Sequence, residues 1–146
     1  MQRITVPNKV LLLEVTRLLD EGQIVILRVK GNSMLPFIIG DRDSVVLQKA
    51  RLLQPGDIVL AHLEDGRYVL HRVIRCNGDD IILMGDGNLQ GAERCKRIDI
   101  VGQAIKIIRN GRYVDCSARS ERRNAELWKR LLSLRRYLLA VYRRTR

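Results

Sequence analysis

Two residues of this sequence have the types and local settings of a hydrolytic pair, Ser33 and His71. Ser33 lies in the segment Gly-Asn-Ser-Met-Leu-Pro, which directly follows a run of apolar residues typical of a β-strand. A serine in a glycine-containing turn at a strand end can be held exposed, with backbone N–H groups close to its hydroxyl. Acyl transfer requires this arrangement of nucleophile and oxyanion hole. A turn serine with no chemical role is the common alternative for such a segment.

The second residue of the pair, His71, lies in the segment Val-Leu-His-Arg-Val-Ile. Strand alternation would place its side chain on the same face as Val69 and Val73. Burial on that face would keep the imidazole neutral, and a neutral imidazole can accept the proton of a serine hydroxyl. The alternative is a core histidine bonded to a backbone carbonyl group. The other histidine, His62, has no comparable sequence context.

The elements that position these residues can be predicted from the spacing of apolar and turn residues. Apolar residues recur at helical intervals over residues 8–20, with Asn8 as N-cap and Gly22 as C-terminal stop. Over residues 24–115, short apolar runs alternate with Gly, Asn, Asp and Pro turns, which indicates a coiled antiparallel sheet. Within this sheet we expect a hairpin formed by Leu60–Leu63 and Arg67–Arg75, and a later long strand at Ile98–Ile108.

The C-terminal segment, residues 119–146, has a different composition. It holds ten Lys or Arg and two Glu, so it carries +8 of the net charge of +11. An apolar stripe recurs every three or four residues and consists of Leu127, Leu131, Leu134, Leu138 and Val141. We therefore predict a basic amphipathic helix that docks on the domain. A helix lying on an anionic membrane surface is the alternative, and nucleic acid is not expected as a partner.

Several short segments resemble, in order, those of the signal peptidase I superfamily, to which the LexA-like peptidases belong. They are Gly31-x-Ser33-Met34-x-Pro36, Gly40-Asp41, Pro55-Gly56-Asp57-Ile58-Val59, His71-Arg72-Val73-Ile74, Gly85-Asp86-Gly87-Asn88 and Val101-Gly102. The resemblance covers about residues 24–108 and implies a mainly β catalytic core that hydrolyses a peptide bond in a precursor or leader peptide. Bacterial signal peptidases have a lysine base at the position of His71, so this chain resembles the endoplasmic-reticulum and archaeal type.

The resemblance also implies roles for individual residues. Ser33 would be the nucleophile and His71 the general base. Members of the histidine type have two aspartates after the Gly-Asp-x-Asn segment, where this chain reads Leu-Gln-Gly-Ala-Glu, so Asp86 is the best substitute for the third member of a triad. The oxyanion and substrate contacts would come from Gly31, Asn32, Met34 and Pro36. No metal and no cofactor are expected.

The expected organisation is a catalytic domain over residues 1–118 and a docked C-terminal helix over residues 119–146. We expect a soluble, cytoplasmic protein, with peripheral membrane contact through that helix as an option, because no apolar run reaches the length of a membrane span or signal peptide. The partner is a peptide or protein substrate, and the oligomeric state stays open. The cysteines Cys76, Cys95 and Cys116 form no metal or disulfide pattern.

Two other functions compete with a peptidase that acts on a separate substrate. One is a non-enzymatic or regulatory binding module on the same fold, which the unfilled position of the triad acid favours. The other is a LexA-like self-cleaving regulator. The self-cleaving regulator is disfavoured by the single helix before the sheet, by the absence of an Ala-Gly or Cys-Gly dipeptide, and by His71 where that family places a lysine.

Overall fold

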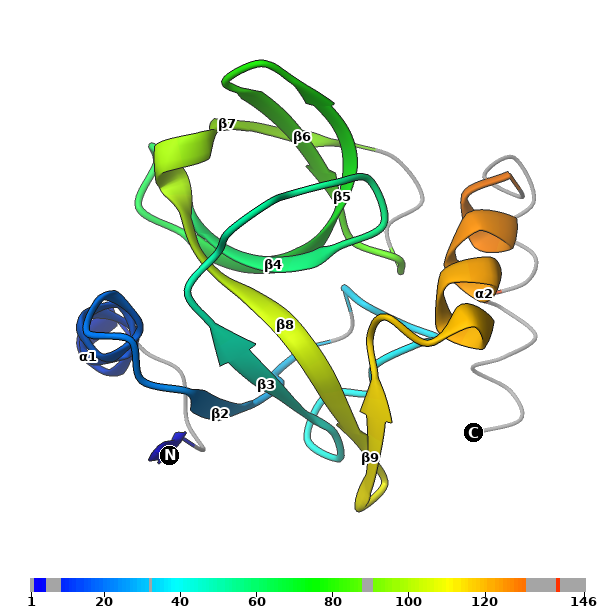
Figure 1. Cartoon of the computed structure of the whole chain (residues 1–146), viewed down its shortest axis with the longest axis horizontal. Coiled ribbons are helices and arrows are strands. Elements are labelled where there is room, and N and C mark those ends of the chain that lie inside the picture. Colours follow the sequence, from blue (N-terminus) through cyan, green and yellow to red (C-terminus); the bar gives the residue numbers. More distant parts are fainter. Residues whose placement is uncertain (1, 5–8, 32, 88–90, 131–138, 140–146) are drawn as a thin grey trace.

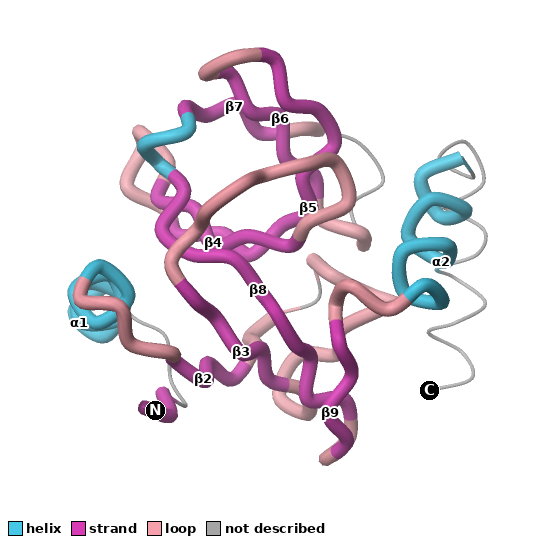
Figure 2. The backbone as a smooth tube through the Cα atoms, viewed as in Figure 1, coloured by secondary structure: helices cyan, strands magenta, loops and turns pink. Residues whose placement is uncertain are grey.

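The computed structural model describes residues 2–4, 9–31, 33–87, 91–130 and 139 (Figure 1). Among these residues a nine-stranded sheet curls into a half-barrel, with one helix at each side (Figure 2). The strands are β1 (Gln2–Ile4), β2 (Val25–Arg28), β3 (Ser44–Gln48), β4 (Ile58–His62), β5 (Tyr68–Asn77), β6 (Asp80–Met84), β7 (Glu93–Lys96), β8 (Ile100–Arg109) and β9 (Arg112–Asp115). The helices are α1 (Lys9–Asp20), the short 3-10 helix η1 (Arg97–Asp99) and α2 (Arg119–Arg130).

The strands follow the order β1-β2-β3-β8-β4-β5-β6-β7, and β9 pairs with β8. All pairs are antiparallel except β1 with β2. Register shifts interrupt the β3–β8, β4–β8 and β5–β6 ladders, and such irregularities bend strands and increase their twist. The curl of the sheet follows from these bends. The structure therefore confirms the predicted mainly β fold and adds one parallel strand at its edge.

Helix α1 ends as the sequence predicts. Gly22 has a positive φ of 86°, the N–H of Gly22 donates to Leu19 (3.0 Å), and the N–H of Gln23 donates to Leu18 (2.9 Å). These two bonds form a Schellman motif, which glycine accommodates without strain. The helix packs Leu19 against Gly102 of β8, where an added Cβ would meet the leucine Cδ1 at 2.8 Å. Asn8, the expected N-cap, lies outside the described residues.

The core consists of two main apolar clusters on opposite faces of the sheet. One lies beneath α1 and includes Val15, Leu19 and Leu47. The other lies inside the curl of β4 to β8 and includes Val59 and Leu83. The strand that carries His71, β5, contributes to both clusters, so that its two faces are both covered along part of its length. This strand is therefore a rigid support for the side chain of His71.

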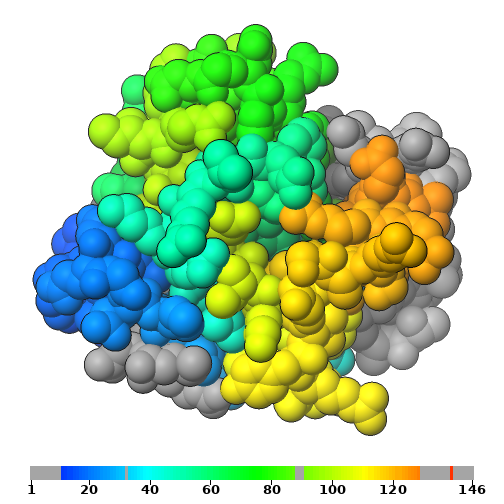
Figure 3. Space-filling view, viewed as in Figure 1, coloured from blue at the N-terminus to red at the C-terminus, as the bar shows by residue number. Residues whose placement is uncertain are grey.

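Helix α2 begins at Arg119, as expected, and lies against the segment before β4 and the end of β9 (Figure 3). Its buried residues are Ala125 and Trp128. The prediction for Leu127 was wrong, because this side chain is 54% exposed and turns away from the domain. The other residues of the expected apolar stripe, from Leu131 to Val141, lie outside the described residues. No helix in the described ranges is long and apolar enough to cross a membrane.

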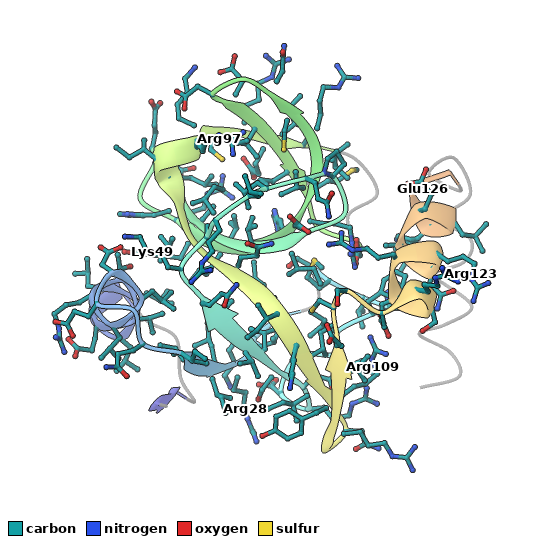
Figure 4. All side chains as sticks on the ribbon, viewed as in Figure 1. Arg28, Lys49, Arg97, Arg109, Arg123 and Glu126 are labelled. Atoms are coloured by element: carbon teal, nitrogen blue, oxygen red, sulfur yellow. The ribbon has the colours of Figure 1, made fainter. Side chains whose placement is uncertain are left out.

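Two ion pairs join α2 to the sheet. Glu121 accepts from Arg109 of β8 at 2.6 Å, and Arg122 donates to the buried carboxylate of Asp57 at 2.5 Å. Arg109 points toward α2, whereas Arg123 lies on the outer side of the helix (Figure 4). Glu126 lines a cavity together with Gly56 and Arg72. The contact face of α2 thus includes Ala125 and Trp128 and the charged residues Glu121 and Arg122.

Candidate active site

The loop that carries Ser33 is closed at its base by two glycines. A Cβ atom on Gly40 would lie 2.1 Å from the carbonyl oxygen of Gly31, so the two backbones approach more closely than any side chain at position 40 permits. The N–H of Asp41 donates to the carbonyl oxygen of Val29 at 2.9 Å and completes the closure. The Gly40-Asp41 segment therefore fixes the geometry of the loop that carries Ser33.

A buried carboxylate, Asp43, fixes the far end of this loop. It accepts from the N–H groups of Ile39 (2.8 Å) and Asn110 (3.0 Å) and from the guanidinium of Arg42 (2.7 Å). Burial by itself would raise the pKa of Asp43, but these hydrogen bonds outweigh burial and hold the pKa below its ordinary value. Asp43 thus remains ionised and ties the loop to the turn that follows β8.

Ser33 lies half-buried at the start of a single helical turn. The carbonyl oxygen of Met34 accepts from the N–H groups of Phe37 and Ile38, both at 3.0 Å. Met34, expected as a substrate contact, is 1% exposed and belongs to the core beneath α1. Its burial anchors the turn and leaves Ser33 beside it. No hydrogen bond joins the Ser33 hydroxyl to any other described residue.

The other expected contacts have different positions. Gly31 is exposed and has a φ of 77°, a left-handed backbone conformation that glycine adopts at little cost in free energy. Pro36 is half-buried and follows Leu35 through a cis peptide bond. Asn32 lies outside the described residues. The backbone of Gly31 thus packs against Gly40, while the space where its Cβ atom would stand is open.

A turn between β6 and β7 holds Ser33 from the other side. The N–H of Gly87 donates to the carbonyl oxygen of Ser33 at 2.7 Å. This bond brings together two segments that the sequence separates by more than fifty residues, the Gly-x-Ser-Met and Gly-Asp-Gly segments. The neighbouring residue in the turn, Asp86, is 2% exposed.

His71 is 6% exposed, and its Nδ1 atom is buried without a hydrogen-bond partner among the described residues. Burial lowers the pKa of His71. The negative charges of Glu93 and Asp86 raise it in part, and the positive charge of Arg67 lowers it further. The net effect is a pKa below the ordinary value of an imidazole. His71 is therefore a neutral ring at neutral pH, as the strand pattern predicts.

Asp86, the expected third member of a triad, binds a different residue. Its two carboxylate oxygens accept from the guanidinium of Arg72 at 2.8 and 2.7 Å, and Arg72 also donates to the carbonyl oxygen of Gly56. Both side chains are almost fully buried. Because Arg72 occupies both oxygens, Asp86 acts on His71 only through its charge. Sequence reasoning missed this pair, although both residues stand in the segments that carry the resemblance.

An apolar cavity lies beside these segments, between α1 and the sheet. It is lined by Leu12, Leu27, Arg28, Val29, Lys30, Leu60, Tyr68 and Leu70. Its walls thus include the residues that lead into the Ser33 loop and those that precede His71. Among the described residues, no group of three His, Cys, Asp or Glu side chains is placed to hold a metal ion. The side chains with the potential for chemistry in these segments are the Ser33 hydroxyl and the imidazole of His71.

The fold and these segments together define a member of the LexA and signal peptidase superfamily of serine peptidases. A model of the Peptidase S24-like family matches residues 2–105, and the chain belongs to that family. The matched region contains Ser33, His71 and Asp86. Helix α2 lies beyond it.

Curated relatives include LexA repressors from three bacteria. The chain is 29% identical over 93 residues to that of Leuconostoc citreum (64% of this chain, 44% of the relative) and 32% identical over 85 residues to that of Petrotoga mobilis (57% and 42%). It is 34% identical over 91 residues to that of Alkaliphilus oremlandii (62% and 43%). The match covers less than half the length of each of these relatives.

Proposed function

We propose that this protein is a serine endopeptidase that cleaves a precursor or leader peptide, with Ser33 as nucleophile and His71 as general base. The observation that carries the proposal is the state of His71, a buried imidazole with a lowered pKa on strand β5. A neutral imidazole of this kind can take the proton of a serine hydroxyl. Its buried Nδ1 atom has no partner among the described residues, which agrees with a serine–histidine pair that has no triad acid bonded to the ring.

In this mechanism the Ser33 oxygen attacks the carbonyl carbon of the peptide bond while His71 takes the hydroxyl proton. Backbone N–H groups of the loop, first that of Ser33, stabilise the oxyanion. The imidazolium then gives the proton to the leaving amine, which yields an acyl-enzyme. Water, deprotonated by His71, releases the acid and restores the serine. Asp86 contributes the negative charge near the imidazolium, and Arg72 fixes its position.

The substrate would bind as an extended strand beside β5. Strand β6 pairs with β5 only from Arg72 onward, so the edge of residues 68–70 has no strand partner among the described residues on that side. An extended peptide could add to this edge by main-chain hydrogen bonds. One of its apolar side chains would then enter the cavity between α1 and Tyr68. The largely apolar lining of that cavity favours an apolar residue near the cleaved bond.

A LexA-like self-cleaving regulator is the second candidate, favoured by the names of the relatives. The two functions differ in molecularity. Self-cleavage within one chain has a rate that does not depend on protein concentration, whereas cleavage of a separate peptide follows enzyme concentration. Binding of DNA would belong to the second candidate, and we expect none for the residues described. A binding module without activity is the third candidate.

The direct test is labelling by a fluorophosphonate probe, read by intact mass and by peptide mapping. We expect one adduct on Ser33, none in Ser33→Ala, and strongly slowed labelling in His71→Ala. His62→Phe is the matched control, because this second histidine is exposed and phenylalanine keeps its stacking on Tyr68, so that labelling should not change. Absence of any adduct on folded wild-type protein would favour the binding module.

A further inference from the structure

The C-terminal helix α2 lies outside the matched family region, yet it contacts the candidate active site through Trp128. The indole N–H of Trp128 donates to the carbonyl oxygen of Asp86 at 2.7 Å, and the indole is buried. That carbonyl belongs to the peptide group between Asp86 and Gly87. The N–H of the same peptide group donates to the carbonyl oxygen of Ser33. A single peptide plane therefore links the helix to the nucleophile loop.

The same residues also form a closed ring of side-chain contacts. Trp128 packs edge-on against Phe37, with ring centroids 6.4 Å apart, and the guanidinium carbon of Arg72 lies 5.1 Å from the centre of the Phe37 ring. Arg72 holds the carboxylate of Asp86, and the carbonyl of Asp86 accepts from Trp128. The ring joins the nucleophile loop, strand β5, the turn at Asp86 and helix α2. Each of the four segments is thereby positioned by the other three.

Two more contacts strengthen the link between α2 and the loop. Glu121 binds Arg109, and Arg109 donates to the carbonyl oxygen of Phe37 at 3.1 Å. A small apolar cluster also buries Leu35 and Ile39 of the loop against Trp128 and Leu139. The C-terminal segment therefore holds four residues of the loop. It packs directly on Leu35, Phe37 and Ile39, and it reaches Ser33 through the peptide group of Asp86 and Gly87. Besides its ion pair with Asp57, α2 thus contacts the one loop in which the proposed chemistry depends most on position.

We propose that Trp128 is a positioning residue for Ser33 and that α2 is an added part of the catalytic apparatus of this protein. The proposal rests on the proposed function of Ser33. The indole hydrogen bond fixes the peptide plane of Asp86 and Gly87, and this plane fixes the carbonyl of Ser33. Since attack requires the reacting atoms to be held in a narrow geometry, loss of the bond slows the chemical step.

The test uses the full chain with Trp128→Phe, which keeps an aromatic ring in the cluster and removes the N–H donor. Leu127→Ala is the matched control, because it lies on the same helix and its side chain is exposed. We expect Trp128→Phe to lower kcat and the rate of Ser33 labelling by roughly three- to tenfold, the effect of one hydrogen bond. KM and the pH midpoint of activity should not change, because neither the substrate cavity nor His71 contacts Trp128.

Amide hydrogen exchange gives a readout that does not depend on activity. In Trp128→Phe the N–H of Gly87 should exchange faster than in wild type, while amides of β8 should not change. Exchange and labelling rates equal to those of wild type would overturn the positioning role. If Ser33 is not labelled in wild type, the proposed function fails. Faster exchange at Gly87 would in that case still show that Trp128 orders the turn, without a catalytic consequence.

Discussion

His71 and Arg72 are neighbours in β5, and strand alternation sends their side chains to opposite faces of the sheet. The regular pairing of β4 with β5 over this stretch keeps the alternation intact. His71 therefore lies on the same face as Val69 and Val73, whereas Arg72 lies against the ring of Phe37. One strand thus supplies the proposed base on one face and the anchor of the Asp86 turn on the other.

Removal of either member of the proposed pair should abolish activity. Ser33→Ala and His71→Ala are each expected to lose peptidase turnover and to keep the wild-type circular dichroism spectrum. Because the two residues act as one unit, the double variant should be little worse than either single variant. Steady-state kinetics on a peptide substrate measure this. Substantial turnover in either single variant would exclude the assignment.

Activity should rise with pH through the titration of His71. An unperturbed imidazole titrates near 6.5, and burial moves the pKa of His71 lower, so the neutral fraction is already large at neutral pH. We expect kcat/KM to have a midpoint below about 6.5 and a plateau above it. The pH profile of His62→Phe, which keeps the stacking on Tyr68, should be the same. A midpoint in the alkaline range of a lysine such as Lys49 would indicate a different base.

Asp86→Asn should lower stability more than it lowers the chemical rate. The substitution leaves the buried guanidinium of Arg72 without its counter-charge, and breaking a buried ion pair in this way costs about 3–5 kcal/mol. Asp80→Asn is the control, since its ion pair with Lys96 is exposed and such pairs contribute about 0–1 kcal/mol. Urea denaturation measures both. An unchanged midpoint combined with a large loss of kcat would instead make Asp86 a member of a triad.

The sequence predicted those features that depend on local chemistry. Gly22 ends α1 as expected, and the hairpin of β4 and β5 lies within a few residues of the predicted ranges. Contacts between distant segments could not be predicted. From the sequence, Asp86 could pair with His71 or with Arg72. The two side chains lie on opposite faces of β5, and only the folded structure shows that the Arg72 face meets Asp86. Likewise, buried Trp128 donates to a carbonyl group 42 residues away, a contact that helical periodicity does not reveal. The spacing of apolar residues therefore predicted that Leu127 is buried, whereas it is exposed.

Gly40→Ala should be more damaging than substitution of a glycine with open surroundings. The new Cβ would meet the backbone oxygen of Gly31 at 2.1 Å, so the base of the Ser33 loop must open. Gly22→Ala is the comparison, because no atom lies within 4 Å of its Cβ and only the positive φ is unfavourable, at about 1–2 kcal/mol. Thermal unfolding should show a clearly larger loss for Gly40→Ala. Equal losses of thermal stability would mean that the backbones of Gly31 and Gly40 do not approach as closely as the structure indicates.

Removal of residues 119–146 should lower the thermal stability of the domain. Without α2, Leu35 and Ile39 lose their cover, and each buried side chain of this kind contributes about 1.5–3 kcal/mol. Arg109 and the buried Asp57 also lose their charged partners. A helix that instead lay on a membrane would give the opposite result, because each basic residue near an anionic surface adds about 1 kcal/mol of attraction. Its removal would leave the melting temperature unchanged and abolish binding to vesicles that contain phosphatidylserine. Calorimetry and vesicle sedimentation on the truncated and full chains therefore separate a helix that docks on the sheet domain from one that lies on a membrane surface.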